Sequence, residues 1–266
     1  RRGWVEQDPV EILRVSAAVM RKAVKDSGVS PSAILGMGIT NQREATVLWD
    51  KQTGKPVYPI IGWEDTRTQK FCQSFPEQDQ QTVREATGLP IDSYFSASKI
   101  RWVLKHSLEA RELAVAGRLA FGTIDSWLLW SLCEDQPHVT DETNAARTLL
   151  FNIHTRRWDE SLLNRFNVSS SILPIVSSSR ANFGILDKDV VGARIPVLAV
   201  CGDQQASTYA AIRSASSSSP VKVTYGTGVF VVQVLGKRFQ LHPSFLTTLV
   251  PDKHGTSFAF EGKIEG

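Results

Sequence analysis

Residues 195–205, Ile-Pro-Val-Leu-Ala-Val-Cys-Gly-Asp-Gln-Gln, join a continuous apolar run to a polar end. Ile195–Cys201 is short enough for one buried strand, and Ala206–Ile212 is typical of a helix. Ligands of open α/β sheets bind outside the carboxyl ends of strands. Asp203 lies at such an end, where it can accept a proton from an attacking hydroxyl or, alternatively, cap the helix that follows.

Helical and extended segments alternate along the rest of the chain. Asp8 and Pro9 predict the start of a helix that Gly28 ends. Other extended segments are expected at 34–40, 46–50 and 57–63, and other helices at 65–75, 96–106 and 125–132. Residues 134–148 lack periodicity and are expected to form a loop, whereas 221–225 and 229–234 indicate a hairpin. The alternation predicts an α/β fold with a mixed sheet flanked by helices.

The composition is that of an ordinary globular protein. The chain has 266 residues, and its net charge of +3 does not indicate a nucleic-acid partner. No apolar run reaches the ~18 residues of a membrane span. The 3 cysteines and 5 histidines show no metal-ligand spacing, so no metal site is expected among them. Widely separated cysteines are typical of reduced thiols in a cytoplasmic protein.

Two further segments contain polar residues or glycines that could bind a ligand. In Asn41-Gln42-Arg43-Glu44, Arg43 offers a fork of donors and Glu44 offers acceptors, a pair suited to adjacent hydroxyls of a polyol. A solvated hairpin turn is the alternative. Tyr225-Gly226-Thr227-Gly228 can expose backbone N–H groups to a phosphate, but a hairpin needs glycine at such a turn in any case.

Aromatic residues stand near these segments in the predicted fold. The faces of Trp63, Tyr94 and Phe230 can wall a polyol pocket against its C–H edges. Burial in an ordinary apolar core is the alternative for each of them.

Eight motifs stand in one order along nearly the whole chain, from Gly3 to Gly262. They are GWVEQDP at 3–9, GITNQRE at 38–44, WEDTRT at 63–68, YFSASK at 94–99, GTIDSW at 122–127, DETNAART at 141–148, GDQQA at 202–206 and YGTG at 225–228. In this order the chain resembles the glycerol kinases of the FGGY family of carbohydrate kinases. The most specific motif is 41–44, because xylulokinases of the same family carry other residues there. The resemblance implies an actin/hexokinase-like (ribonuclease H-like) fold.

The resemblance also implies an activity and a set of site residues. The activity is ATP-dependent phosphorylation of glycerol to sn-glycerol 3-phosphate, with Mg²⁺, by a cytoplasmic enzyme that is often a homo-oligomer. Asp203 matches a glycerol ligand and the catalytic base. The other matches are to ligands of the glycerol hydroxyls (Arg43, Glu44, Tyr94, Gln204), to aromatic walls (Trp63, Phe230) and to the turn that meets the ATP phosphates (Gly226, Thr227, Gly228).

The chain departs from the family pattern in two ways. Glu64, Ala45 and Val229 replace the usual residues beside the matched ligands, which concerns fine specificity more than reaction class. Residues 1–262 are expected to be the substrate-binding N-terminal domain, incomplete at its N-terminus because the family's first strand and hairpin are missing. Residues 263–266 are then expected to begin the connection to an absent nucleotide-binding domain.

The expected consequence is that this chain alone is inactive, although it keeps most matched polyol ligands. Two alternatives remain at this point. One is a related FGGY kinase that acts on another polyol or sugar. The other is a truncated, non-catalytic module that binds a polyol or a partner protein.

Overall fold

The central strands bring two distant polar segments to one edge of a sheet. The computed structural model describes residues 2–215, 219–225, 229–253 and 255–264. In it β11 (Ile195–Gly202) pairs in parallel with β2 (Met37–Asn41) and antiparallel with β10 (Ile185–Leu186). Gly202 stands opposite Asn41 in the register, so the two parallel strands end together.

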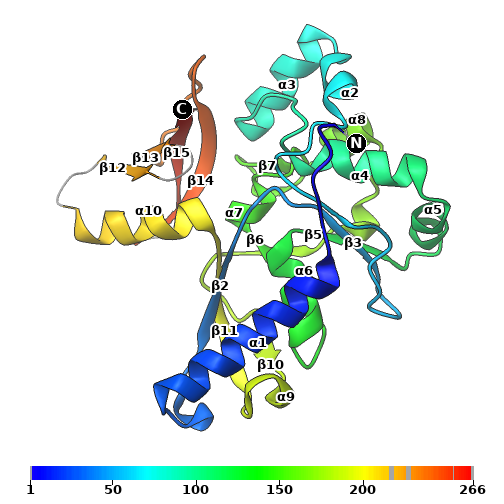
Figure 1. Ribbon diagram of the computed structural model, residues 1–266. Helices are drawn as coiled ribbons and strands as arrows, with labels where there is room; N and C mark the ends of the chain where they lie inside the picture. The colour runs from blue at the N-terminus through cyan, green and yellow to red at the C-terminus, as the bar shows by residue number, and fades with distance from the viewer. Residues whose placement is uncertain (1, 216–218, 226–228, 254, 265–266) are drawn as a thin grey trace.

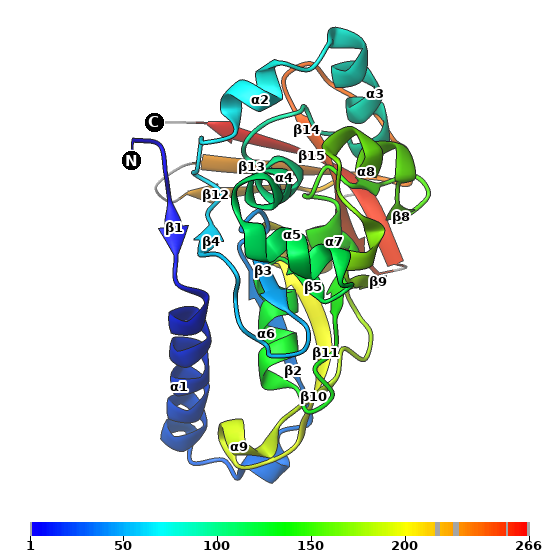
Figure 2. The same ribbon diagram turned by 90° about the vertical axis from the view of Figure 1, so that its right-hand side faces the viewer.

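The long helix α1 (Pro9–Ser27) covers one face of this sheet, as a comparison of Figures 1 and 2 shows. Asp8 begins the helix by accepting a hydrogen bond from the backbone N–H of Val10 at 2.8 Å. Gly28 ends it in the left-handed region, with φ 67°. The buried face of α1 shares an apolar cluster with residues of α6 (Ile124–Leu132) and α9 (Lys188–Val191).

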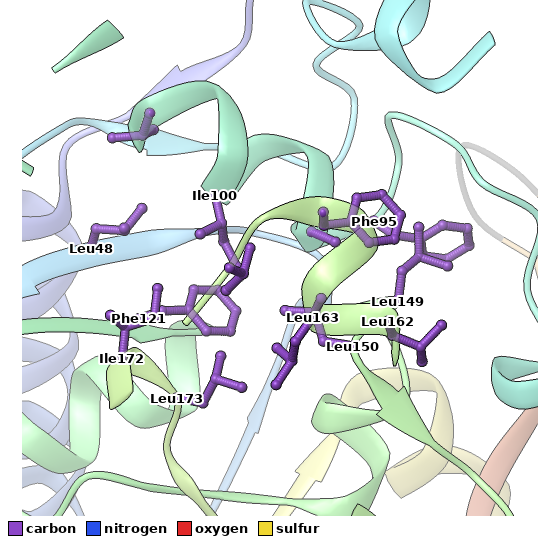
Figure 3. Close-up of a cluster of buried hydrophobic side chains, with 14 of the residues drawn as sticks. Leu48, Phe95, Ile100, Phe121, Leu149, Leu150, Leu162, Leu163, Ile172 and Leu173 are labelled. Atoms are coloured by element: carbon purple, nitrogen blue, oxygen red, sulfur yellow. The ribbon is translucent and has the colours of Figure 1, made fainter. Parts of the chain in front are cut away.

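A second pair of strands packs against a group of helices. β3 (Val47–Asp50) pairs antiparallel with β5 (Leu119–Gly122), and every residue of both strands is buried. Side chains from these strands and from α4 (Ser96–His106), α5 (Leu108–Val115) and α8 (Glu160–Phe166) form a large apolar cluster, part of which Figure 3 shows. Each fully buried Leu, Ile or Phe side chain contributes about 1.5–3 kcal/mol, so this cluster fixes β3 firmly against the helices.

The C-terminal strands form a separate antiparallel sheet beside the central one (Figure 1). Its order is β12 (Val221–Tyr225), β13 (Val229–Gly236), β15 (Gly255–Ile264) and β14 (Leu246–Asp252). Helix α10 (Asp203–Ser214) continues directly from β11 and packs against β14. The carboxyl end of β11 therefore lies between the two sheets.

Short elements complete the fold. They are β1 (Glu6–Gln7), the 3-10 turn η1 (Pro31–Ala33), β4 (Ile60–Ile61), α2 (Gln69–Gln73), α3 (Glu77–Thr87), β6 (Val139–Asp141), α7 (Glu142–Ala145), β7 (Phe151–Asn152), β8 (Arg157–Trp158), the 3-10 turn η2 (Ser170–Ile172) and β9 (Ile175–Ser177). None of the helices in the described part of the chain has both the length and the apolar character needed to span a bilayer.

The predicted α/β class with a mixed sheet and flanking helices is confirmed. The helix after Asp8, the helix at 96–106 and the hairpin strands at 221–225 and 229–234 are also confirmed. The loop expected at 134–148 is wrong in part, because β6 and α7 lie within it. Of the extended segment at 57–63, only Ile60–Ile61 is a strand. The helix expected at 65–75 shortens to Gln69–Gln73, while α3 and α5 were not predicted.

Candidate active site

The segment that follows β2 crosses from one sheet to the other. Because β2 pairs with β11 and β3 pairs with β5, the connection between β2 and β3 is not a hairpin turn. Arg43 and Glu44 in this connection are almost fully buried, at 2% and 3% exposure. The solvated-turn alternative is therefore wrong, and both charged side chains need partners inside the protein.

Those partners form a closed set of four charges, which we call the charge ring: Arg43, Glu44, Arg147 and Glu261. Glu261 accepts hydrogen bonds from both Nη atoms of Arg43, at 2.7 and 2.9 Å. Arg147 donates from Nε to Oε1 of Glu44 at 2.7 Å, and its Nη2 lies 3.4 Å from Oε1 of Glu261. Nη2 of Arg43 lies 3.6 Å from Oε1 of Glu44, which closes the ring.

The charge ring is neutral and dry. Two arginines face two carboxylates, and all four side chains are exposed by 4% or less. Burial alone would raise the pKa of Glu261, but Arg147 and Arg43 outweigh it and lower the pKa to about 2. Burial opposes the charge of Arg43, yet Glu261 and Glu44 hold its pKa well above the usual value. Glu261 and Arg43 therefore stay ionised throughout the physiological range.

Three donor atoms of the ring are left without a hydrogen-bond partner among the described residues. They are Nε of Arg43 and both Nη atoms of Arg147. Nε of Arg43 lies 3.5 Å from Oδ1 of Asp203, which is an ion-pair distance rather than a close hydrogen bond. Buried donors without partners are rare in folded proteins, so the unpartnered Nε of Arg43 beside Asp203 marks a site for a polar ligand.

Asp203 is the first residue of α10, and its side chain is half exposed, at 52%. Gly202 holds the N-cap position, so Asp203 is not the cap of this helix. Oδ1 of Asp203 accepts from the backbone N–H of Gln204 at 2.8 Å, and Oδ2 makes no hydrogen bond to a described residue. The neighbouring Gln204 directs Oε1 to Nζ of Lys222 at 2.8 Å. A carboxylate with one free oxygen next to two cations, Arg43 and Lys222, can receive a proton beside an anionic group.

Two aromatic rings, those of Trp63 and Tyr94, lie near the charge ring. The rings of Trp63 and Tyr94 meet edge to face with centroids 5.7 Å apart, and the ring of Tyr94 lies 5.8 Å from the guanidinium carbon of Arg147. Burial, followed by the charge of Glu44, raises the pKa of Tyr94. A cavity of about 500 Å³ opens beside Trp63 and Tyr94, with Lys263 at its rim. The aromatic pair thus forms one wall of this cavity.

Phe230 lies on the same face of the C-terminal sheet as Glu261 of the charge ring, because its register partner is two residues from Glu261 on β15. It lies on β13, where its register partner on β15 is Lys263. Nζ of Lys263 lies 5.3 Å from the centroid of the Trp63 ring, which is the contact that links this edge of the C-terminal sheet to the aromatic wall. The predicted phosphate turn, Gly226, Thr227 and Gly228, lies outside the described residues.

Lys99 fixes the backbone of two predicted ligands. Its Nζ donates to the carbonyl oxygens of Glu44 and Tyr94, both at 2.8 Å, from a fully buried position on α4. Burial lowers the pKa of Lys99 to about 7, although Glu44 opposes this effect. A single side chain therefore holds the segment after β2 at a fixed distance from the segment before α4.

A buried polar network supports the backbone just before Asp203. Oγ1 of Thr143 accepts from the backbone N–H of Gly202 at 2.9 Å and donates to Oδ2 of Asp141 at 2.7 Å. Asn144 donates to Asp141 at 2.9 Å and meets Asn41, at the end of β2, at 3.0 Å. The network therefore ties the ends of β2 and β11 together through α7.

Asp125 is the fully buried end of this network, and it predicts a pH dependence. Thr140 donates to it at 2.7 Å, and Thr123 and Asn41 donate to its other oxygen. Burial raises the pKa of Asp125 from 3.8 to about 6. Because the folded pKa is the higher one, the stabilisation is complete below pH ~4 and is lost as the pH rises through 6.

We expect Asp125→Asn to remove this dependence. Unfolding by urea at several pH values between 4 and 7 should show wild type losing on the order of 3 kcal/mol relative to the variant as the pH rises, since a shift of about 2 pKa units corresponds to that free energy. Asp26→Asn, at an exposed carboxylate bonded to Lys22, is the matched control and should run parallel to wild type. A pH-independent difference between wild type and Asp125→Asn would contradict the prediction.

Three of the predicted site residues are thus brought together, because Glu44 and Asp203 each lie within 3.6 Å of Arg43. Tyr94 lies beside Arg147 of the charge ring and contacts Trp63, and Gln204 lies next to Asp203. The sequence reasoning missed the roles of Arg147, Glu261 and Lys99. Glu261 carried a usable signal, because it is a charged residue in the alternating strand segment Phe-Ala-Phe-Glu at 258–261.

The described residues contain no group of three or more His, Cys, Asp or Glu side chains arranged to hold a metal ion. Mg²⁺ in phosphoryl-transfer sites is commonly bound by one or two carboxylates together with water and substrate phosphates. The half-exposed Asp203, with its unbonded Oδ2, fits that limited requirement.

Comparison with known proteins identifies the family of the chain. Residues 1–210 match the model of the FGGY family of carbohydrate kinases, N-terminal domain. The chain belongs to the FGGY family of carbohydrate kinases. This FGGY chain is 48% identical to a glycerol kinase of Marinomonas sp. (strain MWYL1) over 98% of its own length and 53% of the relative, and 46% identical to a glycerol kinase of Alcanivorax borkumensis with the same two coverages.

Solved structures show the same fold. Glycerol kinase of Plasmodium falciparum with ADP superposes on this FGGY chain with a TM-score of 0.90 at 34% identity, covering 100% of the chain and 54% of that structure. Xylulose kinase of Rhodospirillum rubrum gives a TM-score of 0.83 at 20% identity, which supports the fold alone. The predicted actin/hexokinase-like fold is confirmed. The chain spans about half the length of the relatives that it matches.

Proposed function

We propose that residues 1–262 of this FGGY chain form the substrate-binding domain of a kinase that transfers the γ-phosphoryl group of ATP to glycerol, giving sn-glycerol 3-phosphate. The observation that carries the proposal is that buried Arg43 lies within 3.6 Å of both Glu44, which is also buried, and Asp203, which is half exposed at the end of β11. Relatives described as glycerol kinases match the chain over 98% of its length, which supports glycerol as the substrate.

The chemistry assigns each of these side chains a distinct task. Arg43 presents an unpartnered donor at Nε and Glu44 presents a free acceptor at Oε2, a combination that suits two adjacent hydroxyls. Asp203 takes the proton from the third hydroxyl, which attacks the phosphorus in line. Trp63 and Tyr94 cover the carbon backbone of the polyol and exclude water from it.

When bound, ATP supplies the phosphoryl group, and Mg²⁺ neutralises much of its charge. The side chains of this chain provide positioning and additional positive charge. Lys222 bonds to Gln204, the residue next to Asp203, and stands on β12 immediately before the predicted phosphate turn. Its charge, with that of Arg43, therefore faces the region where an anionic group must approach Asp203.

A substrate panel tests the proposal. Steady-state kcat/KM is measured for the enzyme that carries this domain with glycerol, propane-1,2-diol, erythritol, xylitol and D-xylulose, with ATP as donor. We expect glycerol to be preferred by about 100-fold or more. A substrate without a hydroxyl opposite Arg43 or Glu44 would leave that buried charge without its hydrogen bond. A preference for a pentulose or a pentitol would refute glycerol as the substrate.

The same assay is also carried out with the isolated 266-residue chain. Because it spans about half the length of its relatives, we propose that it does not turn over glycerol by itself. Phosphorylation at an ordinary kinase rate of about 1–100 s⁻¹ by the purified chain would contradict this part of the proposal.

A further inference from the structure

Two members of the charge ring have no role in the function proposed so far. We propose that Glu261 and Arg147 are positioning residues. Glu261 holds some polar atoms of Arg43, and Arg147 holds one oxygen of Glu44. Each ligand keeps one free polar atom for the substrate, and this arrangement sets which polyols the site accepts. This inference rests on the proposed function, because it concerns how the same two ligands meet the substrate.

Glu261 fixes both Nη atoms of Arg43. Its two oxygens take both Nη atoms of the guanidinium at 2.7 and 2.9 Å, a bidentate arrangement that fixes the plane of the group. Gln205 accepts a second bond from Nη1 at 3.1 Å. The only donor of Arg43 left unpartnered by the described residues is Nε, the atom that lies 3.5 Å from Asp203. Arg43 thus offers a substrate one donor in one direction.

Arg147 fixes one carboxylate oxygen of Glu44 in the same way. Its Nε holds Oε1 of Glu44 at 2.7 Å, while Oε2 makes no hydrogen bond to a described residue. The guanidinium carbon of Arg147 also lies beside the paired rings of Tyr94 and Phe95, at 5.8 and 5.2 Å from their centroids. Glu44 is thereby left with one free acceptor of fixed direction.

The ring also prevents the two ligands from neutralising each other. Nη2 of Arg43 is already 3.6 Å from Oε1 of Glu44, and a small rotation would bring the pair into direct contact. Glu261 and Arg147 occupy the groups that would make that contact. Without either of them, Arg43 and Glu44 can pair internally, and a substrate hydroxyl then competes with a buried ion pair.

The two positioning residues come from parts of the fold that carry none of the matched hydroxyl ligands. Glu261 is on β15 of the C-terminal sheet, and Arg147 follows α7. Both are fully buried, so neither touches the substrate from the solvent side. Their effect must pass through Arg43 and Glu44, which makes substrate discrimination, rather than turnover alone, the property to measure.

The test compares glycerol with propane-1,2-diol, which lacks one terminal hydroxyl, in the enzyme that carries this domain. Glu261→Gln is expected to raise KM for glycerol by about 10- to 100-fold, the loss expected for a misaligned charged hydrogen bond. KM for ATP should change by less than about 2-fold. Discrimination between the two polyols should fall by about 10-fold, because a missing hydroxyl no longer leaves an aligned donor empty.

Asp50→Asn is the matched control. Asp50 is also a carboxylate bonded bidentately to an arginine, Arg118, with its pKa lowered to about 2 by that hydrogen bond, but it lies at the far end of β3. We expect this variant to lose stability and to keep wild-type KM and discrimination. The comparison separates positioning of the ligands from general destabilisation of the domain.

Arg147→Lys keeps the test decisive if Glu261→Gln folds poorly, because it retains the charge and loses the planar donor fork. It should reproduce the higher glycerol KM and the lower discrimination in folded enzyme, as verified by circular dichroism. Wild-type KM and discrimination in either folded variant would overturn the inference. If wild type instead prefers another polyol, only the proposed substrate fails, and the same comparison with that polyol and its deoxy analogue tests the ring.

Discussion

Replacing Asp203 with asparagine is expected to lower kcat for glycerol phosphorylation by about 10²- to 10⁴-fold, the usual contribution of a positioned general base. The amide keeps the size of the side chain and loses the ability to take a proton. Oδ1 already accepts from the N–H of Gln204, so the variant can retain its local geometry. The loss should therefore appear in kcat, while KM for glycerol changes by less than about 10-fold.

Glu160→Gln is the matched control for this substitution. Glu160 is also an exposed acidic residue at the first position of a helix, α8, so it reproduces the loss of a negative charge at a helix N-terminus. It should change stability by no more than about 1 kcal/mol and leave kcat unaltered. Should Asp203→Asn retain more than a tenth of the wild-type kcat, another group must take the proton.

Replacing Gly202 with alanine is expected to cost about 3–5 kcal/mol of unfolding free energy. A Cβ at this position would lie 2.5 Å from both Cγ and Cδ of Arg43 and 2.8 Å from Oε1 of Gln205. These atoms are in the middle of the Arg43 side chain, whose far end is held by Glu261. Arg43 must therefore leave the charge ring, and a buried carboxylate remains without its partner.

Gly38→Ala provides the control on the neighbouring strand. Its added Cβ would lie 3.5 Å from the nearest atom, the carbonyl oxygen of Ala199, which is an ordinary van der Waals contact. Neither glycine has a positive φ, so the pair differs in steric fit and not in backbone strain. Urea unfolding should show a small change for Gly38→Ala and the large loss for Gly202→Ala; equal effects would show that the Arg43 contact does not decide the outcome.

The parts of the site that lie within one sequence motif could be predicted from the sequence. Arg43 and Glu44 are adjacent, and Asp203 directly follows an apolar strand, so local pattern was enough to find them. The pairing of Glu261 with Arg43 could not be found in this way, because 218 positions separate the two residues and only the pairing of β15 with its neighbours brings them together. The role of Lys99 could not be predicted either, because a lysine on a helix usually indicates an exposed face.

The errors in the fold have a similar physical origin. Residues 134–148 lack apolar periodicity because Asp141 and Asn144 are buried through hydrogen bonds rather than through apolar contacts. Helix α3 was missed because its sequence, Glu77–Thr87, is almost entirely polar and packs through few residues such as Val83. Patterns based on hydrophobicity fail where polar side chains supply the packing.

The neutrality of the charge ring has a consequence for how the domain can change over evolutionary time. Replacing any one of Arg43, Glu44, Arg147 or Glu261 with an uncharged residue leaves a charge excess in a buried place. A tolerated change at one position thus requires a compensating change at a second, although the four residues lie on three separate parts of the chain. We expect descendants of this domain that acquire a new substrate to exchange these residues in pairs, so that a shift in specificity passes through two coupled substitutions rather than one.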